Sequence, residues 1–291
     1  SAAQLKSADV VLCVTGTFDE EHAERPFAMD NKEESLVRLA VESNPNTIVL
    51  VHSGSAINMT AWADKCAALL YGWYPGQNGQ KAIRDIIIGK VNPSGKLPMT
   101  IERDFADSPA VDTVPEGFDL KKAIGNPNEK AFQTWTYDVY YDESVLVGYR
   151  WYEKKNIQPL FPFGYGLSYN KYEYSNLKVN KSDFVADDEL VFTVDVKNAG
   201  TRVGKESVLL FSSDLVASLT PDNRRLRHFE KIELQPGETK TVTFKLKGSD
   251  LAFVGADGKW RLEEGDFRMQ AGDQVLNVKC TATKIWNTPN K

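Results

Sequence analysis

A strongly charged loop follows the first apolar stretch of the sequence. Between Gly16 and Pro26, the segment GTFDEEHAERP holds four acidic residues, one histidine and one arginine. Carboxyl groups held beside a reacting bond can donate and accept protons, so this loop is a candidate for general acid–base catalysis. The alternative is an exposed acidic loop that only caps the next helix, because acidic residues in loops are usually solvated.

The elements on both sides of this loop are predicted from local patterns. Residues 10–14 form an apolar run that is typical of a buried strand. After the loop, Asp30 and Glu33 match a capping box, which predicts the start of a helix. The helix would bury a face that carries Leu36, Leu39, Ala40 and Ser43, and it would end at residues 44–46, Asn-Pro-Asn.

Two further apolar runs and a second helix complete an alternating pattern. Residues 47–51 (TIVLV) form a continuous β-branched run, which is typical of a parallel strand buried on both faces. Another strand is expected within residues 66–74, and a helix within 79–89. This order predicts a parallel sheet covered by helices. Ligands bind at the carboxyl ends of strands in such sheets, and the charged loop lies there.

The remaining sequence divides into two regions of different character. Residues 105–173 are rich in aromatic side chains and have no clear periodicity, which predicts an irregular connecting segment packed against other parts. From residue 174 onward, short alternating strands are separated by turns such as QPGE and ADGK, which predicts a β-sandwich. We therefore predict an α/β region at 1–104, a connecting segment at 105–173 and an all-β sandwich at 174–291.

Composition excludes several classes of function. The 291 residues carry a net charge of −5, and basic residues are scattered among acidic ones, so a nucleic-acid surface is not expected. No apolar run approaches the roughly 18 residues of a membrane span. Three cysteines, Cys13, Cys66 and Cys280, lie far apart and predict free thiols rather than a zinc site. His52 and His228 have no serine or aspartate at the spacing of a hydrolase triad, and no cofactor or metal is predicted.

Three long stretches together resemble one enzyme family. They are YPGQNGQKAIRDIIIGKVNPSGKLPMT (74–100), VGYRWYEKKNIQPLFPFGYGLSY (147–169) and LRHFEKIELQPGETKTVTFKLKGSDLAFVGADGKWRLEEGDFRMQAG (226–272). Their order and spacing are similar to the C-terminal half of the glycoside hydrolase family 3 β-glucosidases. The resemblance implies part of an α/β sandwich domain with a mostly parallel sheet, followed by a fibronectin-III-like sandwich.

The resemblance also implies a role for the charged loop. Family members carry their catalytic general acid/base after this strand, often in a pattern Glu-Gly-x-Asp-Arg, and residues 21–25 (EHAER) stand at that place. Glu21 is then the predicted acid/base, with Glu20 and Glu24 as the register alternatives. This sequence departs from the pattern in two positions, because His22 replaces a glycine and Glu24 an aspartate. Arg25 is expected to orient the loop through a carboxylate.

The implied partner is the family's catalytic barrel, which supplies the nucleophile and needs about 250 residues. Three strands of a doubly covered sheet would also leave an apolar edge open. We therefore expect the chain to belong to a longer polypeptide, or to be one half of a nicked protein, that acts on a β-glucoside or oligosaccharide and is secreted or periplasmic. The alternatives are a β-xylosidase or other exo-glycosidase, and a non-catalytic carbohydrate-associated module.

Overall fold

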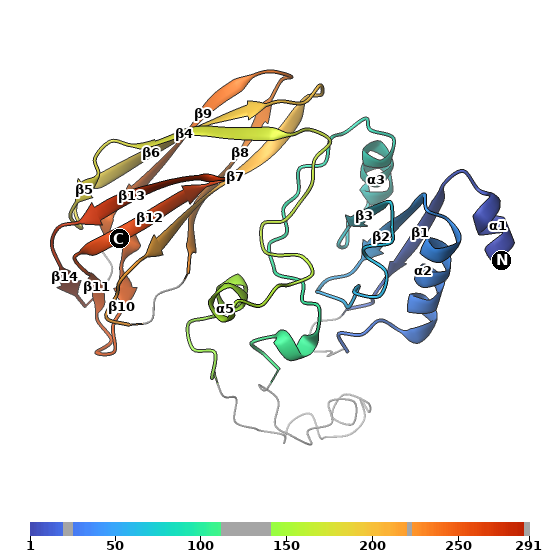
Figure 1. The fold of residues 1–291 in the computed structure, drawn as a ribbon, viewed down its shortest axis with the longest axis horizontal. Coiled ribbons are helices and arrows are strands. Elements are labelled where there is room, and N and C mark those ends of the chain that lie inside the picture. Colours follow the sequence, from blue (N-terminus) through green and yellow to red (C-terminus); the bar gives the residue numbers. More distant parts are fainter. Residues whose placement is uncertain (20–25, 112–140, 220–222, 288–291) are drawn as a thin grey trace. The chain divides into compact units, whose positions relative to one another are not determined.

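The computed structural model describes residues 1–19, 26–111, 141–219 and 223–287 (Figure 1). The chain divides into two compact units, which are described here one at a time. The first, the α/β unit, comprises residues 1–87 and 97–164, and the second, the sandwich unit, comprises residues 88–96 and 165–291. The predicted fold class, α/β followed by all-β, is confirmed. Within the described residues, no helix has the length and apolar character needed to cross a membrane.

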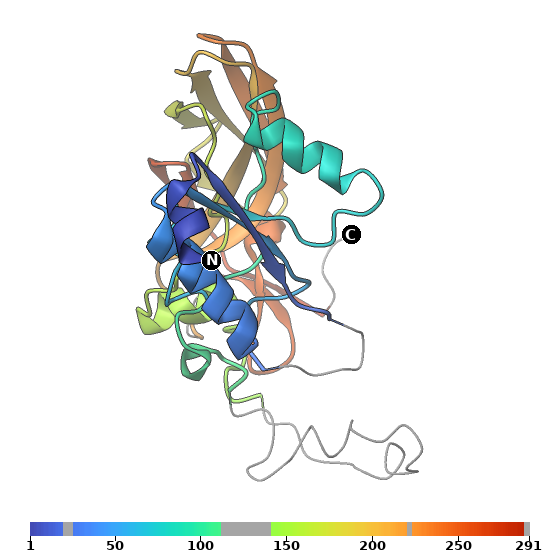
Figure 2. The same ribbon diagram turned by 90° about the vertical axis from the view of Figure 1, so that its right-hand side faces the viewer.

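A parallel sheet of three strands organises the α/β unit. The strands are β1 (Val11–Gly16), β2 (Thr47–His52) and β3 (Ala68–Tyr71), in the order β1-β2-β3. Cys13 is paired with Val49, and Val49 with Leu69, which sets the register. The helices are α1 (Ala2–Ser7), α2 (Asn31–Ser43) and α3 (Gly79–Ile87), and α2 lies along the sheet with α1 beside it (Figures 1 and 2). The alternating pattern of strands and helices predicted from sequence is confirmed.

The core of this unit lies on one face of the sheet. Val49 and Val51 point to the side of α2 and are fully buried, and Cys13 packs beside them. Side chains from α2, from the residue Met29 before it, from the turns after β2 and from the bridge residue Ile101 complete the cluster: Met29, Val37, Val41, Ile57, Met59, Trp62 and Ile101. Since side chains alternate across a strand, the neighbours of these residues in β1 and β2 point to the other face.

That other face is only partly covered. Leu50 in the central strand is 2% exposed, whereas Leu12 and Val14 in the edge strand β1 are 51% and 56% exposed. Val10, just before β1, is exposed as well. The continuous apolar run of β1 therefore has one covered and one uncovered face in the described residues.

The prediction of which face of α2 is buried is wrong. Val37, Ala40 and Val41 are its buried residues, whereas Leu36 and Leu39 are 58% and 40% exposed. The buried stripe is displaced from the predicted one by about one residue, or roughly 100° of helix rotation. Branched side chains at positions i and i+4 and a small one at i+3 fit against the sheet, and this packing outweighs the greater hydrophobicity of leucine.

The start of α2 also differs from the prediction in one bond. Asp30 is the N-cap, and its side chain accepts a hydrogen bond from the backbone N–H of Lys32 at 2.9 Å. Glu33 instead accepts a hydrogen bond from the hydroxyl of Thr15 at 3.1 Å. The side chain of Glu33 thus links α2 to β1. The capping-box pattern predicted instead that it would bond to the backbone N–H of Asp30.

The rest of the α/β unit is mostly irregular. It holds a short 3-10 helix, η1 (Phe105–Asp107), and the helix α5 (Tyr149–Lys155), and a single bridge pairs Ile101 with Phe161. Tyr149 stacks on Phe163 with 4.6 Å between ring centroids, and the indole N–H of Trp151 donates to the carbonyl of Asp107. Tyr149, Trp151 and Phe163 thus contact neighbouring segments of the same unit, whereas Tyr141 is 74% exposed.

The sandwich unit consists of two main sheets and a small third one. The five-stranded sheet has the order β5-β13-β12-β7-β8, the three-stranded sheet β4-β6-β9, and the small sheet β10-β11-β14. Its elements are β4 (Tyr172–Val179), β5 (Asp183–Phe184), β6 (Glu189–Asn198), β7 (Gly204–Asp214), β8 (Arg225–Leu234), β9 (Thr239–Lys247), the 3-10 helix η3 (Gly248–Leu251), β10 (Phe253–Val254), β11 (Trp260–Leu262), β12 (Gly265–Ala271), β13 (Gln274–Cys280) and β14 (Lys284–Trp286).

A closed apolar core joins the two main sheets. Alternate residues of β6, from Leu190 to Val196, are fully buried, as the alternation of the sequence predicted. They belong to one cluster with the inward side chains of the other strands, which include Val208, Leu210, Leu234, Val242, Phe244, Phe267, Met269, Ala271, Val278 and Cys280.

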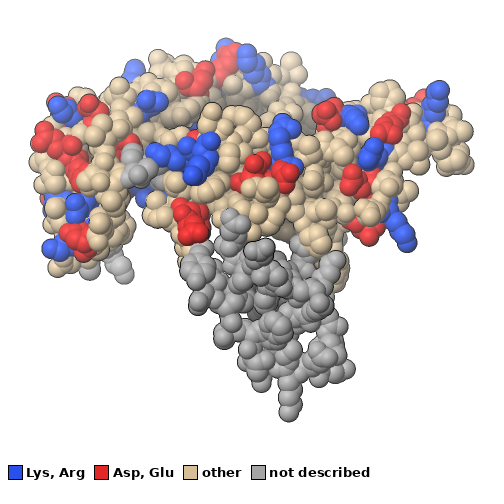
Figure 3. All heavy atoms as spheres, turned by 60° about the horizontal axis from the view of Figure 1, so that its bottom comes forward, with Lys and Arg blue, Asp and Glu red and all other residues tan. Residues whose placement is uncertain are grey.

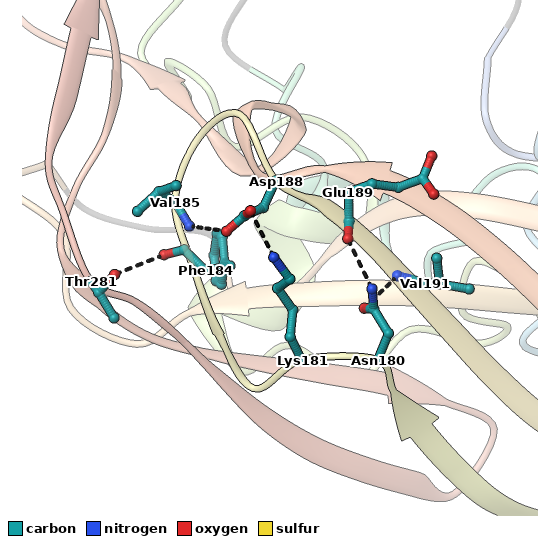
Figure 4. A network of polar contacts seen from close by, with 8 residues as sticks. All are labelled: Asn180, Lys181, Phe184, Val185, Asp188, Glu189, Val191 and Thr281. Atoms are coloured by element: carbon teal, nitrogen blue, oxygen red, sulfur yellow. Dashed lines mark hydrogen bonds and ion pairs between the residues drawn. The ribbon is translucent and has the colours of Figure 1, made fainter.

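Polar side chains brace one end of the sandwich (Figure 4). Asp188 accepts hydrogen bonds from the backbone N–H of Val185 at 2.9 Å and from the ammonium group of Lys181 at 2.7 Å. Asn180 donates to the carbonyl of Glu189 and accepts from the N–H of Val191 (Figure 4). These bonds hold the short connection around β5 in place and satisfy its backbone groups.

Residues 88–96 belong to the sandwich unit although they follow α3 directly. The side-chain oxygen of Asn92 accepts from the hydroxyl of Ser168 and from the N–H of Tyr169, and Lys96 donates to the carbonyl of Gly166 at 2.8 Å. Arg202 donates to the carbonyl of Gly89 at 2.6 Å. The two glycine-containing turns of the sequence, NPSGK and FGYGLSY, thus pair with each other.

Candidate active site

The carboxyl ends of the three parallel strands form a compact edge. The chain leaves β1 through Gly16, and the N–H of Thr17 donates to the carbonyl of His52, at the end of β2, at 2.8 Å. A Cβ at position 16 would collide with that carbonyl, so the close approach requires glycine. The two strand ends are therefore held together at the point where the charged loop begins.

Asp19 is the last described residue before the segment 20–25. One of its carboxylate oxygens, Oδ2, accepts from the backbone N–H of Gly54 at 2.6 Å and from the hydroxyl of Thr17 at 3.0 Å. The hydroxyl of Ser53 lies 3.4 Å from the same oxygen. Asp19 is thus fixed to the turn that follows β2.

Tyr74, beyond β3, holds the same stretch from the other side. Its hydroxyl accepts a hydrogen bond from the N–H of Asp19 at 2.9 Å and donates one to the carbonyl of Thr17 at 3.0 Å. Residues from the ends of all three strands therefore meet around residues 17–19.

The predicted acid/base, Glu21, lies outside the described residues, together with Glu20, His22, Glu24 and Arg25. The structure describes the two ends of the loop instead. On the far side, the carbonyl of Phe27 accepts from the N–H of Asn58 at 2.9 Å, and Met29 is buried in the core. The assignment of Glu21 stays a prediction, and the loop that carries it begins and ends on anchored residues.

His52 shows an interaction of its own at this edge. Its Nδ1 atom lies 2.9 Å from the carbonyl oxygen of Trp73. Among the residues that the structure describes, no cluster of three or more histidine, cysteine, aspartate or glutamate side chains has the arrangement of a metal site. The described polar groups of the edge are hydroxyls, the carboxylate of Asp19, the imidazole of His52 and backbone groups.

A cavity of about 360 Å³ lies elsewhere in the α/β unit. Its lining includes Glu102, Tyr149, Tyr152 and Phe163. Burial, together with the neighbouring Glu102 carboxylate, raises the pKa of Tyr152 far above its usual value, so this phenol stays neutral. Three aromatic residues, Tyr149, Tyr152 and Phe163, form part of the wall, and this hollow is separate from the loop stem at the strand ends.

Two residues of the edge were missed by sequence reasoning. Asp19 counted only as one of four acids in the loop, and Tyr74 only as part of an apolar run. A usable signal was present, because the turn Ser53-Gly54-Ser55 follows β2 directly and therefore must lie beside the exit of β1 in a parallel sheet.

Charge is mixed over the described surface. On the face drawn in Figure 3, lysine and arginine side chains alternate with aspartate and glutamate. Ion pairs such as Arg38 with Glu42 and Lys205 with Glu233 join exposed side chains of opposite sign. This surface suits a neutral ligand better than a polyanion.

Comparisons with known proteins agree over nearly the whole chain. The model of the glycosyl hydrolase family 3 C-terminal domain matches residues 1–169, and that of the fibronectin type III-like domain matches residues 206–275. The chain is 35% identical over 278 residues to thermostable beta-glucosidase B of Acetivibrio thermocellus, covering 94% of the chain and 34% of that protein. It is 33% identical to beta-glucosidase B of Emericella nidulans, with 94% of the chain and 32% of that protein covered.

Solved structures give the same result. The beta-glucosidase from Kluyveromyces marxianus in complex with glucose superposes with a TM-score of 0.83 and 31% identity, over 98% of this chain and 33% of that one. Beta-glucosidase 3B from Thermotoga neapolitana gives 0.84 and 26%, over 98% and 39%. The chain thus spans about a third of the length of the relatives it matches. It belongs to glycosyl hydrolase family 3, of which it carries the C-terminal domain followed by a fibronectin type III-like domain.

Proposed function

We propose that this chain forms the C-terminal part of a retaining exo-acting β-glycosidase, a β-glucosidase that releases terminal glucose. The observation that carries the proposal is the alignment of almost the entire chain with proteins named as beta-glucosidases, in sequence and in fold. The site chemistry is in accord with it, because an acidic loop leaves the carboxyl end of a parallel strand, where open α/β sheets bind ligands.

Glu21 is the proposed general acid/base. Retaining hydrolysis uses two carboxyl groups about 5–5.5 Å apart, one of which attacks the anomeric carbon while the other protonates the leaving oxygen. The second group then removes a proton from the water that hydrolyses the covalent intermediate. Glu21 takes this second role, and the nucleophile comes from a barrel that the 291 residues do not include.

The uncovered face of the sheet supports a partner of this kind. Leu12 and Val14 of β1 expose about half of their surface, although a continuous apolar run is typical of a strand covered on both sides. We propose that the preceding part of the α/β domain covers this face, and that it joins the chain to the barrel, in the same polypeptide or as a separate one.

The proposal is tested with the complete enzyme, meaning this chain together with its barrel part. The value of kcat/KM reports only the first step of hydrolysis, which needs an acid when the leaving group is poor. Glu21→Ala should therefore lower kcat/KM on a disaccharide by about 10²–10⁴-fold. On dinitrophenyl β-glucoside, which leaves without a proton, kcat/KM should change little.

The controls are the neighbouring acids of the loop. Glu20→Ala and Glu24→Ala should lack the difference between the two substrates. A panel of nitrophenyl glycosides on the parent enzyme distinguishes a β-glucosidase from a β-xylosidase. No hydrolysis of any nitrophenyl glycoside by the complete enzyme would mean that the chain serves a non-catalytic module instead.

A further inference from the structure

Several hydrogen bonds hold the stem of the charged loop, residues 17–19, against the turn after β2. Two hydrogen-bond donors meet Oδ2 of Asp19, the N–H of Gly54 and the hydroxyl of Thr17, and the oxygen of Ser53 lies 3.4 Å from the same atom. Hydrogen bonds to a carboxylate are stronger than hydrogen bonds between neutral groups. A charged acceptor therefore anchors the stem to the turn after β2.

The turn that receives Asp19 is held by hydrogen bonds of its own. Ser53 is fully buried, and its hydroxyl donates to the carbonyl of Ser55 at 2.7 Å. The hydroxyl of Tyr71, at the end of β3, donates to the same carbonyl at 2.6 Å. Asp19 is thus bound to a support that β2 and β3 hold from both sides.

Gly54 makes the approach of Asp19 possible. A Cβ at this position would lie 2.9 Å from Oδ2 of Asp19 and 3.0 Å from a ring carbon of Tyr74. Both distances are shorter than ordinary van der Waals contact, so a side chain here would push the anchor away. The turn is shaped to admit the carboxylate and the phenol ring together.

Tyr74 closes the arrangement by bridging two backbone groups. Its hydroxyl accepts from the N–H of Asp19 and donates to the carbonyl of Thr17 (2.9 and 3.0 Å). One side chain therefore fixes the backbone on both sides of Phe18. Asp19 and Tyr74, 55 residues apart in the sequence, meet only because the parallel strands end at one edge.

We propose that Asp19 and Tyr74 are positioning residues that set the place of the acid/base loop. The inference rests on the proposed role of Glu21. Glu21 follows Asp19 by two positions, a reach of at most about 7 Å of chain, so a shift of the anchor reaches the acid directly. Misplacing a catalytic group by about 1 Å can cost 10²-fold in rate.

A positioning role has a signature that a loss of folding lacks. In the complete enzyme, Asp19→Ala should lower kcat/KM on a disaccharide by about 10–100-fold. On dinitrophenyl β-glucoside the loss should stay below about threefold, because that first step needs no acid. Asp19→Asn keeps an acceptor oxygen for Gly54, so it should recover most of the loss. Tyr74→Phe removes only the bridging hydroxyl and should show the same selectivity with a smaller loss.

Asp64→Ala is the matched control, because this aspartate is exposed in the turn before β3. It should leave both substrates unchanged. Equal losses on both substrates in Asp19→Ala and Tyr74→Phe would overturn the proposal, since fewer folded molecules lower every rate alike. No loss in either variant would also overturn it. If Asp19→Ala does not fold, Tyr74→Phe carries the same test, because Tyr74 is 52% exposed and loses a single oxygen.

The two proposals fail in different ways. A selective loss in Glu21→Ala without one in Asp19→Ala and Tyr74→Phe overturns the positioning role alone. Absence of a selective loss in Glu21→Ala overturns the acid/base assignment, and the positioning role with it.

Discussion

Strands β1 and β6 show how differently the two units complete their apolar cores. In β6, every second side chain is fully buried against the opposite sheet, and the others face outward. In β1, Cys13 packs into the core of the α/β unit, whereas Leu12 and Val14 remain about half exposed. The sandwich therefore encloses its core with its own residues, while the sheet of the α/β unit is covered fully on one face and only in part, at its central strand, on the other.

The sequences of the two strands anticipate this contrast. β6 alternates between apolar and polar residues, as expected for a strand with one solvent-facing side. β1 is apolar on both sides, a pattern typical of strands between two layers of helices. The residues of β1 thus fit a neighbour that the described residues do not supply. This is the basis for expecting the partner in the proposed enzyme.

The largest expected effect concerns activity. The chain of 291 residues alone should show no turnover of aryl β-glucosides, because the proposed nucleophile belongs to another part of the enzyme. Adding the barrel part should restore hydrolysis. The measurement is release of nitrophenol with and without that part. Turnover by the pure chain would show that the contrast between a complete and an incomplete unit is mistaken.

The next effect concerns the stability of the two cores. Phe192→Ala, in the closed core, should cost about 3–5 kcal/mol, because it removes a fully buried ring. Leu12→Ala, on the uncovered face, should stay within about 0.5 kcal/mol in the isolated chain. Urea unfolding of both variants measures the difference.

The Leu12→Ala variant extends the comparison of the two cores to the complete enzyme. There Leu12→Ala should become clearly destabilising, by about 2–5 kcal/mol, since the proposed partner buries the side chain. A large cost of Leu12→Ala in the isolated chain would show that the chain covers this face by itself.

A smaller effect concerns pH and a single carboxyl group of the sandwich. Burial raises the pKa of Asp214 to about 6, and the neighbouring Glu263 adds to the effect. The folded state therefore holds this proton more tightly than the unfolded state does. The contribution to stability is present below the ordinary aspartate pKa and is lost as the pH rises towards 6.

Asp214→Asn should remove that dependence. The variant should be more stable than the parent at pH 7, by on the order of 1 kcal/mol, and equally stable near pH 4. The measurement is urea unfolding of the chain between pH 4 and 7. Asp266→Asn, at an exposed position of β12, should leave the pH profile unchanged. The assignment would be contradicted if the stability of the parent rose from pH 4 to 6 and that rise were absent from Asp214→Asn.

Sequence reasoning succeeded where a local pattern decides the structure. The apolar runs at β1, β2 and β3 and the alternation in β6 follow from strand periodicity, and the parallel order follows from the intervening helices. The buried face of α2 was missed because leucine outranks valine in hydrophobicity, whereas fit against the sheet favoured Val37 and Val41. Helical periodicity alone does not indicate which side of the helix the sheet will meet.

The candidate site was predicted in outline only. The place of the acidic loop at a strand end followed from the order of elements, and the assignment of Glu21 from the family resemblance. The anchoring by Asp19 and Tyr74 requires knowledge of which strand ends are neighbours, and of the space that Gly54 leaves open. Such long-range contacts are a property of the folded chain and have no local pattern.

The most direct test of the account is azide rescue of Glu21→Ala in the complete enzyme. Without a general base, the covalent intermediate should persist, and kcat on dinitrophenyl β-glucoside should fall. Azide attacks this intermediate without needing a base, so it should raise kcat again and yield glucosyl azide of retained β configuration. Glu20→Ala should show neither the fall nor the rescue. Rescue of Glu20→Ala but not of Glu21→Ala would place the acid/base one residue earlier, and rescue of neither would contradict a catalytic role for this pair of acids.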